Sequence, residues 1–191
     1  MLGGVLILLL VTVLAEIPVV EAVAAPTEQF GVDDCSLYCA AFPELSVSRH
    51  LAPQERVRYD NARLQDGLAT TAWVVDGGLG EWFEFVFRSG EGQHLEPRLG
   101  VNTLYILNGY RKSEAHWREH ARVRELEVVV DGAARARVRL LDNSQPQRVV
   151  LPNLPLHPDL SVRFVVRGLY PGSRFKETAI SEVRLDGYGH H

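Results

Sequence analysis

Two histidines and a glutamate stand close together in the middle of the chain, and these residue types can bind zinc. His116, Glu119 and His120 have the spacing H-x-x-E-H, which is a signature of one class of zinc peptidases. In such an enzyme both histidines bind the metal from one face of a helix, and the glutamate acts on the metal-bound water. A third ligand must come from elsewhere in the chain, so the surrounding elements decide whether the spacing has catalytic meaning.

The surrounding sequence makes a zinc hydrolase that uses these histidines a distant alternative. A helix over Ser113–His120 has two turns at most, because a strand pattern begins at Val123. Glu177 and Glu182 fall in or beside the last expected strand, so no later helix is expected to carry a third ligand. The sequence also has no G-x-S-x-G, G-x-G-x-x-G or P-loop motif. We therefore expect that the protein is not an enzyme.

The first two dozen residues have the pattern of a secretory leader. Val5–Leu14 is apolar apart from Thr12, and Ala22-Val23-Ala24 offers a small-x-small cleavage site. We expect residues 1–24 to be a signal peptide cleaved near Ala24, and the protein to be secreted, periplasmic or in the cell envelope. No Lys or Arg precedes the apolar run, so a leader retained as a membrane anchor is the alternative. That run is shorter than the ~20 residues that a spanning helix needs.

The charge balance narrows the classes of partner that we expect for this chain. The 191 residues include 20 Lys and Arg against 24 Asp and Glu, which gives a formal net charge of −4. Loss of residues 1–24 removes Glu16 and Glu21 and no base, so the remainder is closer still to neutrality. A near-neutral chain has no overall field that attracts a polyanion. We expect no nucleic-acid partner, and membrane contact only through an uncleaved leader.

The only two cysteines, Cys35 and Cys39, stand in the stretch DDCSLYC. In an oxidising compartment their simplest fate is a mutual disulfide that closes a short loop. A metal site is the alternative, but it would need further ligands, and His50 is the only near candidate.

Most of the remaining chain has the period-two alternation of β-strands. Phe83, Phe85 and Phe87 fall on one face of EWFEFVFR, and in ARARVRLL three arginines alternate with apolar residues. Further candidates are VRELEVVV, NTLYIL, QRVVL, LSVRFVVR and AISEVRL. Turn signals such as Asp131-Gly132 and Pro171-Gly172 separate them. This spacing indicates an all-β sandwich or jelly roll of about eight strands, with short helical pieces only around Cys35–Phe42 and Ser113–His120.

Several segments in order resemble one family. Their motifs are D-G, T-A-W, G-E-W, N-G-Y-x-K-S, R-V-x-x-L and T-x-I-S-E-V, found in DGLATTAWV, GLGEWFEFVF, LYILNGYRKS, HARVRELEVVVDG and LYPGSRFKETAISEVRL. The chain is similar in these segments to the NADase-type glycan-binding domain, a relative of discoidin and coagulation factor type C domains. The resemblance runs from about Tyr59 to Leu185 and implies a galactose-binding-like jelly roll.

The resemblance also implies a division of the chain and an account of the zinc spacing. We expect a connector and cysteine loop over residues 25–58, the jelly-roll domain over 59–187 and a tail over 188–191. In the family a loop with an aromatic residue joins N-G-Y-x-K-S to the R-V-x-x-L strand. EAHWREHA fills that loop here, which makes the H-x-x-E-H spelling an accident of loop composition.

The family's binding loops suggest candidate ligand-binding residues. Such domains meet sugars with aromatic faces and a few polar groups at one end of the sandwich. The matching positions are Asn108, Tyr110, Lys112, Trp117 and Tyr170. For each of them a structural role in a turn, in the core or in solvent is the alternative.

Two more tryptophans are expected in the core. Trp73 follows a T-A pair in a position that packs the sandwich in the resembling family, and Trp82 opens a strand. Both are therefore left out of the candidate site.

Related carbohydrate-binding modules hold a structural calcium near the D-G-x-x-x-T-x-W stretch, together with a late glutamate. Asp66, Thr71 and Glu182 match that pattern, and their oxygens are ligands that Ca²⁺ accepts. Leu68 stands where a second acid is common, so the set has lost one carboxylate. A structural calcium is therefore the one cofactor that the resemblance suggests.

Together these observations predict an exported, non-catalytic module that binds glycans at a cell surface or on extracellular polymer. The alternative is a structural or protein-binding exported module that partners a larger toxin, hydrolase or envelope complex.

Overall fold

A computed structural model of the chain describes residues 16–26, 37 and 41–189. These residues form a β-sandwich of eleven strands, with one short helix and one 3₁₀ turn among the described residues. The strands are β1 (Val19–Glu21), β2 (Val23–Ala24), β3 (Glu44–Val47), β4 (Trp73–Val75), β5 (Trp82–Phe87), β6 (Gly100–Asn108), β7 (Ala121–Val130), β8 (Ala133–Arg139), β9 (Gln147–Pro155), β10 (Leu160–Tyr170) and β11 (Thr178–Tyr188). The helices are the 3₁₀ turn η3 (Asn61–Leu64) and α1 (Glu114–Glu119).

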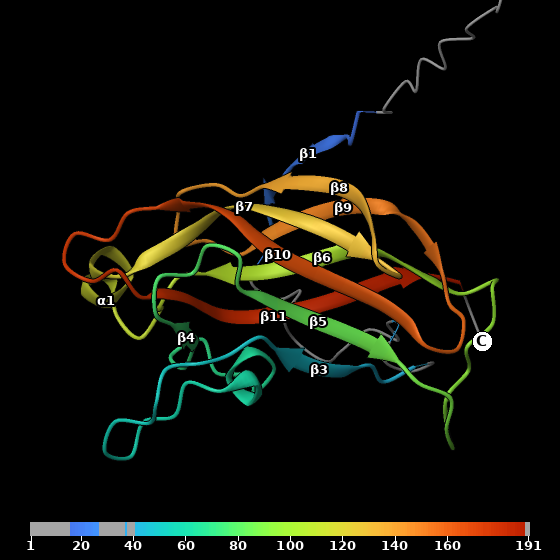
Figure 1. Ribbon diagram of the computed structural model, residues 1–191, viewed down its shortest axis with the longest axis horizontal. Coiled ribbons are helices and arrows are strands. Elements are labelled where there is room, and N and C mark those ends of the chain that lie inside the picture. Colours follow the sequence, from blue (N-terminus) through green and yellow to red (C-terminus); the bar gives the residue numbers. More distant parts are fainter. Residues whose placement is uncertain (1–15, 27–36, 38–40, 190–191) are drawn as a thin grey trace, which may run out of the picture.

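The strands divide into two layers (Figure 1). One layer has the order β2, β9, β6, β11, β4, and the other has β1, β8, β7, β10, β5, β3. The two layers are joined by strand pairing where Thr178 and Ala179 of β11 pair in parallel with Ala121 and Arg122 of β7. This architecture confirms the predicted jelly-roll β-sandwich.

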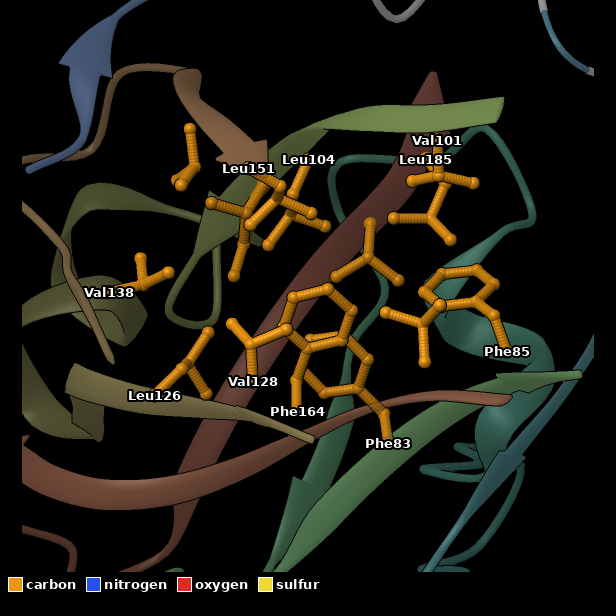
Figure 2. Close-up of a cluster of buried hydrophobic side chains, with 14 of the residues drawn as sticks. Phe83, Phe85, Val101, Leu104, Leu126, Val128, Val138, Leu151, Phe164 and Leu185 are labelled. Carbon is orange, nitrogen blue, oxygen red and sulfur yellow. The ribbon is translucent and has the colours of Figure 1, made fainter. Parts of the chain in front are cut away.

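The core lies between the two layers and follows from the period-two pattern. Phe83, Phe85 and Phe87 of β5 are fully buried, and the Phe83 ring stacks on Phe164 of β10 with centroids 4.9 Å apart. Figure 2 shows the rings of Phe83, Phe85 and Phe164, together with Val128, facing side chains of the opposite layer. The alternation buries one face of β5 and one face of β8, as the sequence predicted.

Of the two tryptophans predicted to lie in the core, one is buried there and the other is not. Trp73 is buried, and its indole N–H donates a hydrogen bond to the Arg49 carbonyl at 2.8 Å, which confirms its core position. The core prediction for Trp82 is wrong. Since Phe83 points inward, Trp82 must point outward, and there the Arg163 guanidinium lies 4.3 Å from its ring centroid.

The turn between β7 and β8 confirms the Asp131-Gly132 signal. Both residues have positive φ, 49° at Asp131 and 79° at Gly132. A two-residue hairpin turn with positive φ at both positions matches the twist of the strands that it joins, and Asp-Gly is among the few pairs that adopt it readily.

The sheets take in residues that the sequence assigned to the leader and connector. β1 pairs with β8 and β2 pairs with β9, so this N-terminal segment contacts one edge strand of each layer (Figure 1). Ala22, between β1 and β2, is 4% exposed, and its N–H donates to the Arg139 carbonyl at 2.8 Å. β3 pairs with β5 in the same way. These strands have two to four residues, which is too short for a period to be recognised.

The remaining predictions about the N-terminal region fall on other residues. Cys35 and Cys39, and with them most of the helical piece predicted at Cys35–Phe42, lie outside the described residues. Within the part of the chain that the structure describes, no helix has the length and apolar character needed to cross a bilayer.

Candidate functional site

An open cavity of about 450 Å³, which we call the end cavity, lies at the end of the sandwich where β6 ends and β7 begins. The helix α1 lies at this end, and the end of β11 lies at the other (Figure 1). Residues from four places in the sequence line it: Leu51, Gln54, Tyr59, Val74, Tyr110, Lys112, His116, Glu119, His120, Arg174, Phe175 and Glu177.

Aromatic side chains form one wall of the end cavity. The Tyr110 ring meets His116 and His120 edge to face, with a centroid distance of 5.3 Å in each case. The two imidazoles are nearly parallel, at 7° and 6.3 Å. Phe175, from the loop between β10 and β11, lies 4.7 Å from the His120 ring. The wall therefore combines apolar faces with ring nitrogens.

The local sequence explains why the two histidines share this wall. Ser113 caps α1, because its hydroxyl oxygen accepts a hydrogen bond from the His116 N–H at 3.2 Å. His116 and His120 are four residues apart and so lie on the same side of the helix end. The helix stops at Glu119 and the chain becomes extended at His120, which leads directly into β7. The short helical piece predicted around Ser113–His120 is confirmed.

Both histidines already have a local partner at Nδ1. His116 Nδ1 lies 2.8 Å from the Ser113 hydroxyl, and His120 Nδ1 lies 2.9 Å from the His116 carbonyl. Glu119 forms an ion pair with Arg174 at 3.7 Å rather than facing the imidazoles. Among the described residues, no group of three His, Cys, Asp or Glu side chains could hold a metal ion. These contacts favour a structural use of the H-x-x-E-H segment.

Polar groups surround the aromatic wall. Lys112 is exposed at the rim, and the buried hydroxyls of Tyr110 and Tyr59 lie near each other. Burial raises the pKa of both phenols, so each is neutral and able to donate a hydrogen bond. Glu177 adds an acceptor on the lining. Donors and acceptors thus face the same space as the rings.

Of the five residues predicted to bind ligand, the structure brings Tyr110 and Lys112 together in the end cavity. Asn108 is buried, and its amide donates to the Val123 carbonyl at 2.7 Å while accepting from the Val123 N–H at 3.1 Å. The Asn108 side chain thus links the end of β6 to the backbone of β7, and both ends of its amide are used in that link. Asn108 therefore positions the next residues of the chain.

Trp117 and Tyr170 also lie off the cavity lining. The Trp117 indole N–H donates to the Asn108 carbonyl at 3.0 Å, and the Arg122 guanidinium lies 4.4 Å from the ring centroid. Gly109 has φ of 88°, and a Cβ there would come within 2.6 Å of the Trp117 ring. The Tyr170 hydroxyl donates to the Leu140 carbonyl at 2.8 Å. Both rings are therefore held against the backbone.

The predicted calcium ligands do come together, next to η3. The Thr71 hydroxyl lies 2.9 and 2.8 Å from the two Asp66 carboxylate oxygens, and Glu182 shares a hydrogen bond with Asp66. Glu182 Oε1 is buried without a hydrogen-bond partner. Burial first, and then the Asp66 carboxylate, raise the pKa of Glu182 to about 8.

The groups around these carboxylates fit a calcium ion poorly as they are arranged. The Arg63 guanidinium lies 3.0 Å from Asp66 Oδ2 and supplies a positive charge there. The backbone groups that face Glu182 are the N–H donors of Gly67 and Leu68, whereas calcium needs oxygen ligands. Calcium binding remains a proposal that a calcium titration of thermal stability would test.

Several residues of the end cavity were not predicted. Phe175 and Arg174 come from the β10–β11 loop, Gln54 comes from the predicted connector, and Tyr59 is the first residue of the predicted jelly-roll domain. His116 and His120 were candidates only for zinc binding. No spacing in the sequence joins these segments, because the topology alone brings them to one end.

The fold and this cavity define a β-sandwich module with an open site among its end loops. The family model described as the NAD glycohydrolase translocation F5/8 type C domain matches residues 37–186. The chain belongs to this family, which confirms the resemblance seen in the sequence.

Solved structures share the fold. The CBM32-1 and CBM32-2 domains of Clostridium perfringens ZmpB in complex with GalNAc align with a TM-score of 0.59 and 11% identity, over 93% of this chain and 42% of theirs. The C. perfringens module CpGH89CBM32-5, in complex with GalNAc-β-1,3-galactose, aligns with a TM-score of 0.50 and 12% identity, over 75% of this chain and 94% of that one.

A third similar structure is the arabinofuranosyltransferase AftD from Mycobacteria, with a TM-score of 0.50 and 18% identity over 76% of this chain. The present chain spans only 11% of the length of AftD. A comparison with curated proteins finds no match.

Proposed function

We propose that this chain is an exported, non-catalytic module that binds glycans at a cell surface or on extracellular polymer, and that the sugar binds in the end cavity. The observation that carries the proposal is the convergence of aromatic faces and hydrogen-bonding groups in one open cavity at the loop end of the sandwich. Tyr110, His120 and Phe175 supply the faces, and Lys112 and Glu177 supply polar atoms.

The chemistry of this lining suits a sugar. A pyranose presents a patch of C–H groups that packs on an aromatic face, and a rim of hydroxyls that needs both donors and acceptors. The lining offers both, and the cavity is open to solvent rather than enclosed. The similar C. perfringens modules were solved with GalNAc and GalNAc-β-1,3-galactose bound, which supports the same class of ligand for this chain.

Export and the disulfide between Cys35 and Cys39 are further parts of the proposal. The apolar run at Val5–Leu14 supports export. Because residues 19–24 pair with both layers, we propose that the segment removed, or held in a membrane, ends upstream of Pro18 rather than at Ala24. Mass spectrometry of the exported protein would give its first residue and show whether the two thiols are joined.

A glycan array with multivalent display tests the binding proposal. A single sugar in an open site binds at about the millimolar level, so avidity is needed to detect it. We expect the wild-type protein to bind a subset of glycans. Phe175→Ala should weaken this binding several-fold by removing an aromatic face worth about 1 kcal/mol.

Phe42→Ala is the matched control, because Phe42 is 57% exposed and lies outside the lining of the end cavity. It should leave glycan binding unchanged. If no glycan on a broad array binds the folded wild-type protein, or if the two variants lose binding equally, the proposed site is wrong.

A second cavity favours the alternative function, a module that docks on a protein partner such as a toxin, hydrolase or envelope component. It also measures about 450 Å³, adjoins the end cavity at Phe175 and is lined mostly by apolar residues, including Leu79, which is 63% exposed, together with Leu169 and Pro171. An exposed apolar residue beside a cavity is a common feature of protein contacts. Leu79→Asp should abolish such docking and leave glycan binding intact.

A further inference from the structure

A third cavity of about 320 Å³, which we call the basic cavity, lies beside the end cavity and is lined by cations. Its lining includes Arg56, Arg58, Arg63 and Lys112, with the hydroxyls of Thr70 and Tyr110. No Asp or Glu side chain is among its lining residues. A chain with a net negative charge has therefore gathered four cations around one hollow.

Three of these four cations have no ionic partner among the residues that the structure describes. Arg63 is neutralised, because it lies 3.0 Å from Asp66 and 3.6 Å from Asp60. Arg56, Arg58 and Lys112 form no ion pair or hydrogen bond with any described residue. Elsewhere on the described surface, many arginines are paired with a carboxylate, as Arg88 is with Glu44 at 2.8 Å.

The hairpin that carries two of these cations is short and ordered by its own backbone. Gln54 and Val57 exchange hydrogen bonds of 2.9 and 3.1 Å, and Glu55 at its tip has φ of 52°. Arg56 stands in the turn at the tip of this hairpin, and Arg58 follows Val57, which closes the hairpin by pairing with Gln54. Both arginines line the basic cavity together with Lys112.

The basic cavity adjoins the end cavity, since the two share lining residues. Tyr110 and Lys112 line both. A chain of sugar residues that occupies the end cavity can therefore extend past Tyr110 into the basic cavity.

We propose that the glycan bound by this module is acidic, and that a carboxylate or sulfate of the sugar lies in the basic cavity against Arg56, Arg58 and Lys112. This inference rests on the proposed glycan-binding function. Guanidinium groups bind such planar or tetrahedral anions through paired, charge-assisted hydrogen bonds. The Thr70 hydroxyl supplies a further donor on the same lining. Neutral glycans would leave these three charges unmatched.

Matched pairs of polysaccharides test the inference. Binding of the folded protein to immobilised polygalacturonate is compared with binding to its fully methyl-esterified form, and binding to dextran sulfate with binding to dextran. Each pair differs only in the anionic group, and the two pairs distinguish a carboxylate from a sulfate. We expect at least about tenfold tighter binding to the acidic member of one pair or both, since each charged hydrogen bond contributes about 1.5–3 kcal/mol.

A double variant and a charge-matched control locate the effect. Arg56→Gln with Arg58→Gln should abolish the preference for the acidic polymer. Arg135→Gln with Arg148→Gln removes the same charge from exposed positions of β8 and β9 and should change the preference less than about twofold, as expected for distant surface charges. Circular dichroism confirms that each variant is folded.

Equal binding to the acidic and the neutral polymers would overturn the inference and leave the glycan-binding function standing. An equal loss in both double variants would also overturn it, because the attraction would then be a general effect of charge. Binding to none of the polysaccharides, by a protein that also fails on the glycan array, would overturn the proposed function itself.

Discussion

Glu182 is a largely buried carboxylic acid. It is 6% exposed, it shares a hydrogen bond with Asp66, and burial raises its pKa to about 8. A carboxyl group with such a pKa is mainly protonated at neutral pH and can donate to its neighbour. The Asp66 carboxylate thus lies between two donors, the protonated Glu182 carboxyl group and the Arg63 guanidinium.

We predict that this group makes folding less stable as the pH rises. In the unfolded chain Glu182 has a pKa near 4.5, so between about 4.5 and 8 the folded state binds more protons. Stability from this group is complete below pH 4.5 and is lost as the pH rises to 8, with a slope of up to ~1.4 kcal/mol per pH unit. Urea unfolding of the wild type and of Glu182→Gln, followed between pH 5 and 9 in EDTA, measures it.

The variant serves as the control, since glutamine keeps a donor toward Asp66 and does not titrate. The difference in unfolding free energy between the two proteins should therefore change with pH in favour of the variant. A difference that stays constant from pH 5 to 9 would show that Glu182 titrates normally.

Trp117 has a structural role, whereas the sequence predicted that it binds ligand. We predict that Trp117→Ala lowers the free energy of unfolding by about 2–4 kcal/mol, because it opens a hole beside Gly109, leaves the Asn108 carbonyl without its donor and removes the ring on which Arg122 packs. Glycan binding per folded molecule should stay the same.

Lys112→Ala is the opposite case on the same segment, since Lys112 is exposed and its loss should change stability by less than about 0.5 kcal/mol. Chemical denaturation with a binding assay on both variants separates the two roles. A Trp117→Ala protein of normal stability that no longer binds glycan would return Trp117 to the binding site.

The N-terminal strands β1 and β2 bear on the stability of the mature protein. Pro18 accepts a hydrogen bond from the Arg137 N–H, and the Ala22 N–H donates to the Arg139 carbonyl, each at 2.8 Å. We predict that a protein that starts at Ala25 is less stable by about 1–3 kcal/mol than one that starts at Glu16, since it loses these bonds and the burial of Ala22. Denaturation of the two purified forms measures the difference.

A pair of point variants in the longer form checks that pairing is the cause. Ala22→Asp places a charge at a buried position and should reproduce the loss, whereas Val23 is 54% exposed and Val23→Asp should be tolerated. If both forms and both variants have the same stability, β1 and β2 contribute nothing to the domain.

Most of the long elements could be predicted from the sequence, and the short ones could not. β5 and β8 show a clear alternation because each has one buried face, and the Asp131-Gly132 turn needs a conformation that few residue pairs adopt. β3 and β4 are held by pairing with β5 and β11 rather than by their own pattern. The outward position of Trp82 could also have been predicted from the sequence, because an inward Phe83 requires its neighbour to point outward.

At the scale of the whole molecule, the candidate site is a product of topology. The N-G-Y-x-K-S segment pointed to Tyr110 and Lys112, which line two cavities. The other walls come from Gln54–Tyr59 and from Arg174–Glu177, far away in sequence, and no spacing within one segment relates them. The basic cavity could not be predicted either, since the chain as a whole is acidic and only the fold gathers its cations.

The central claim is that a glycan binds at the α1 end of the sandwich, and an NMR titration tests it most directly. ¹⁵N-labelled protein is titrated with the glycan that binds best on the array, and amide shift changes are followed to saturation. We predict that the largest changes occur within Tyr110–His120 and Arg174–Glu177, around the end cavity. Changes centred instead on the cavity of about 440 Å³ beside Asp131 and His157, at the other end of β7, would contradict the claim.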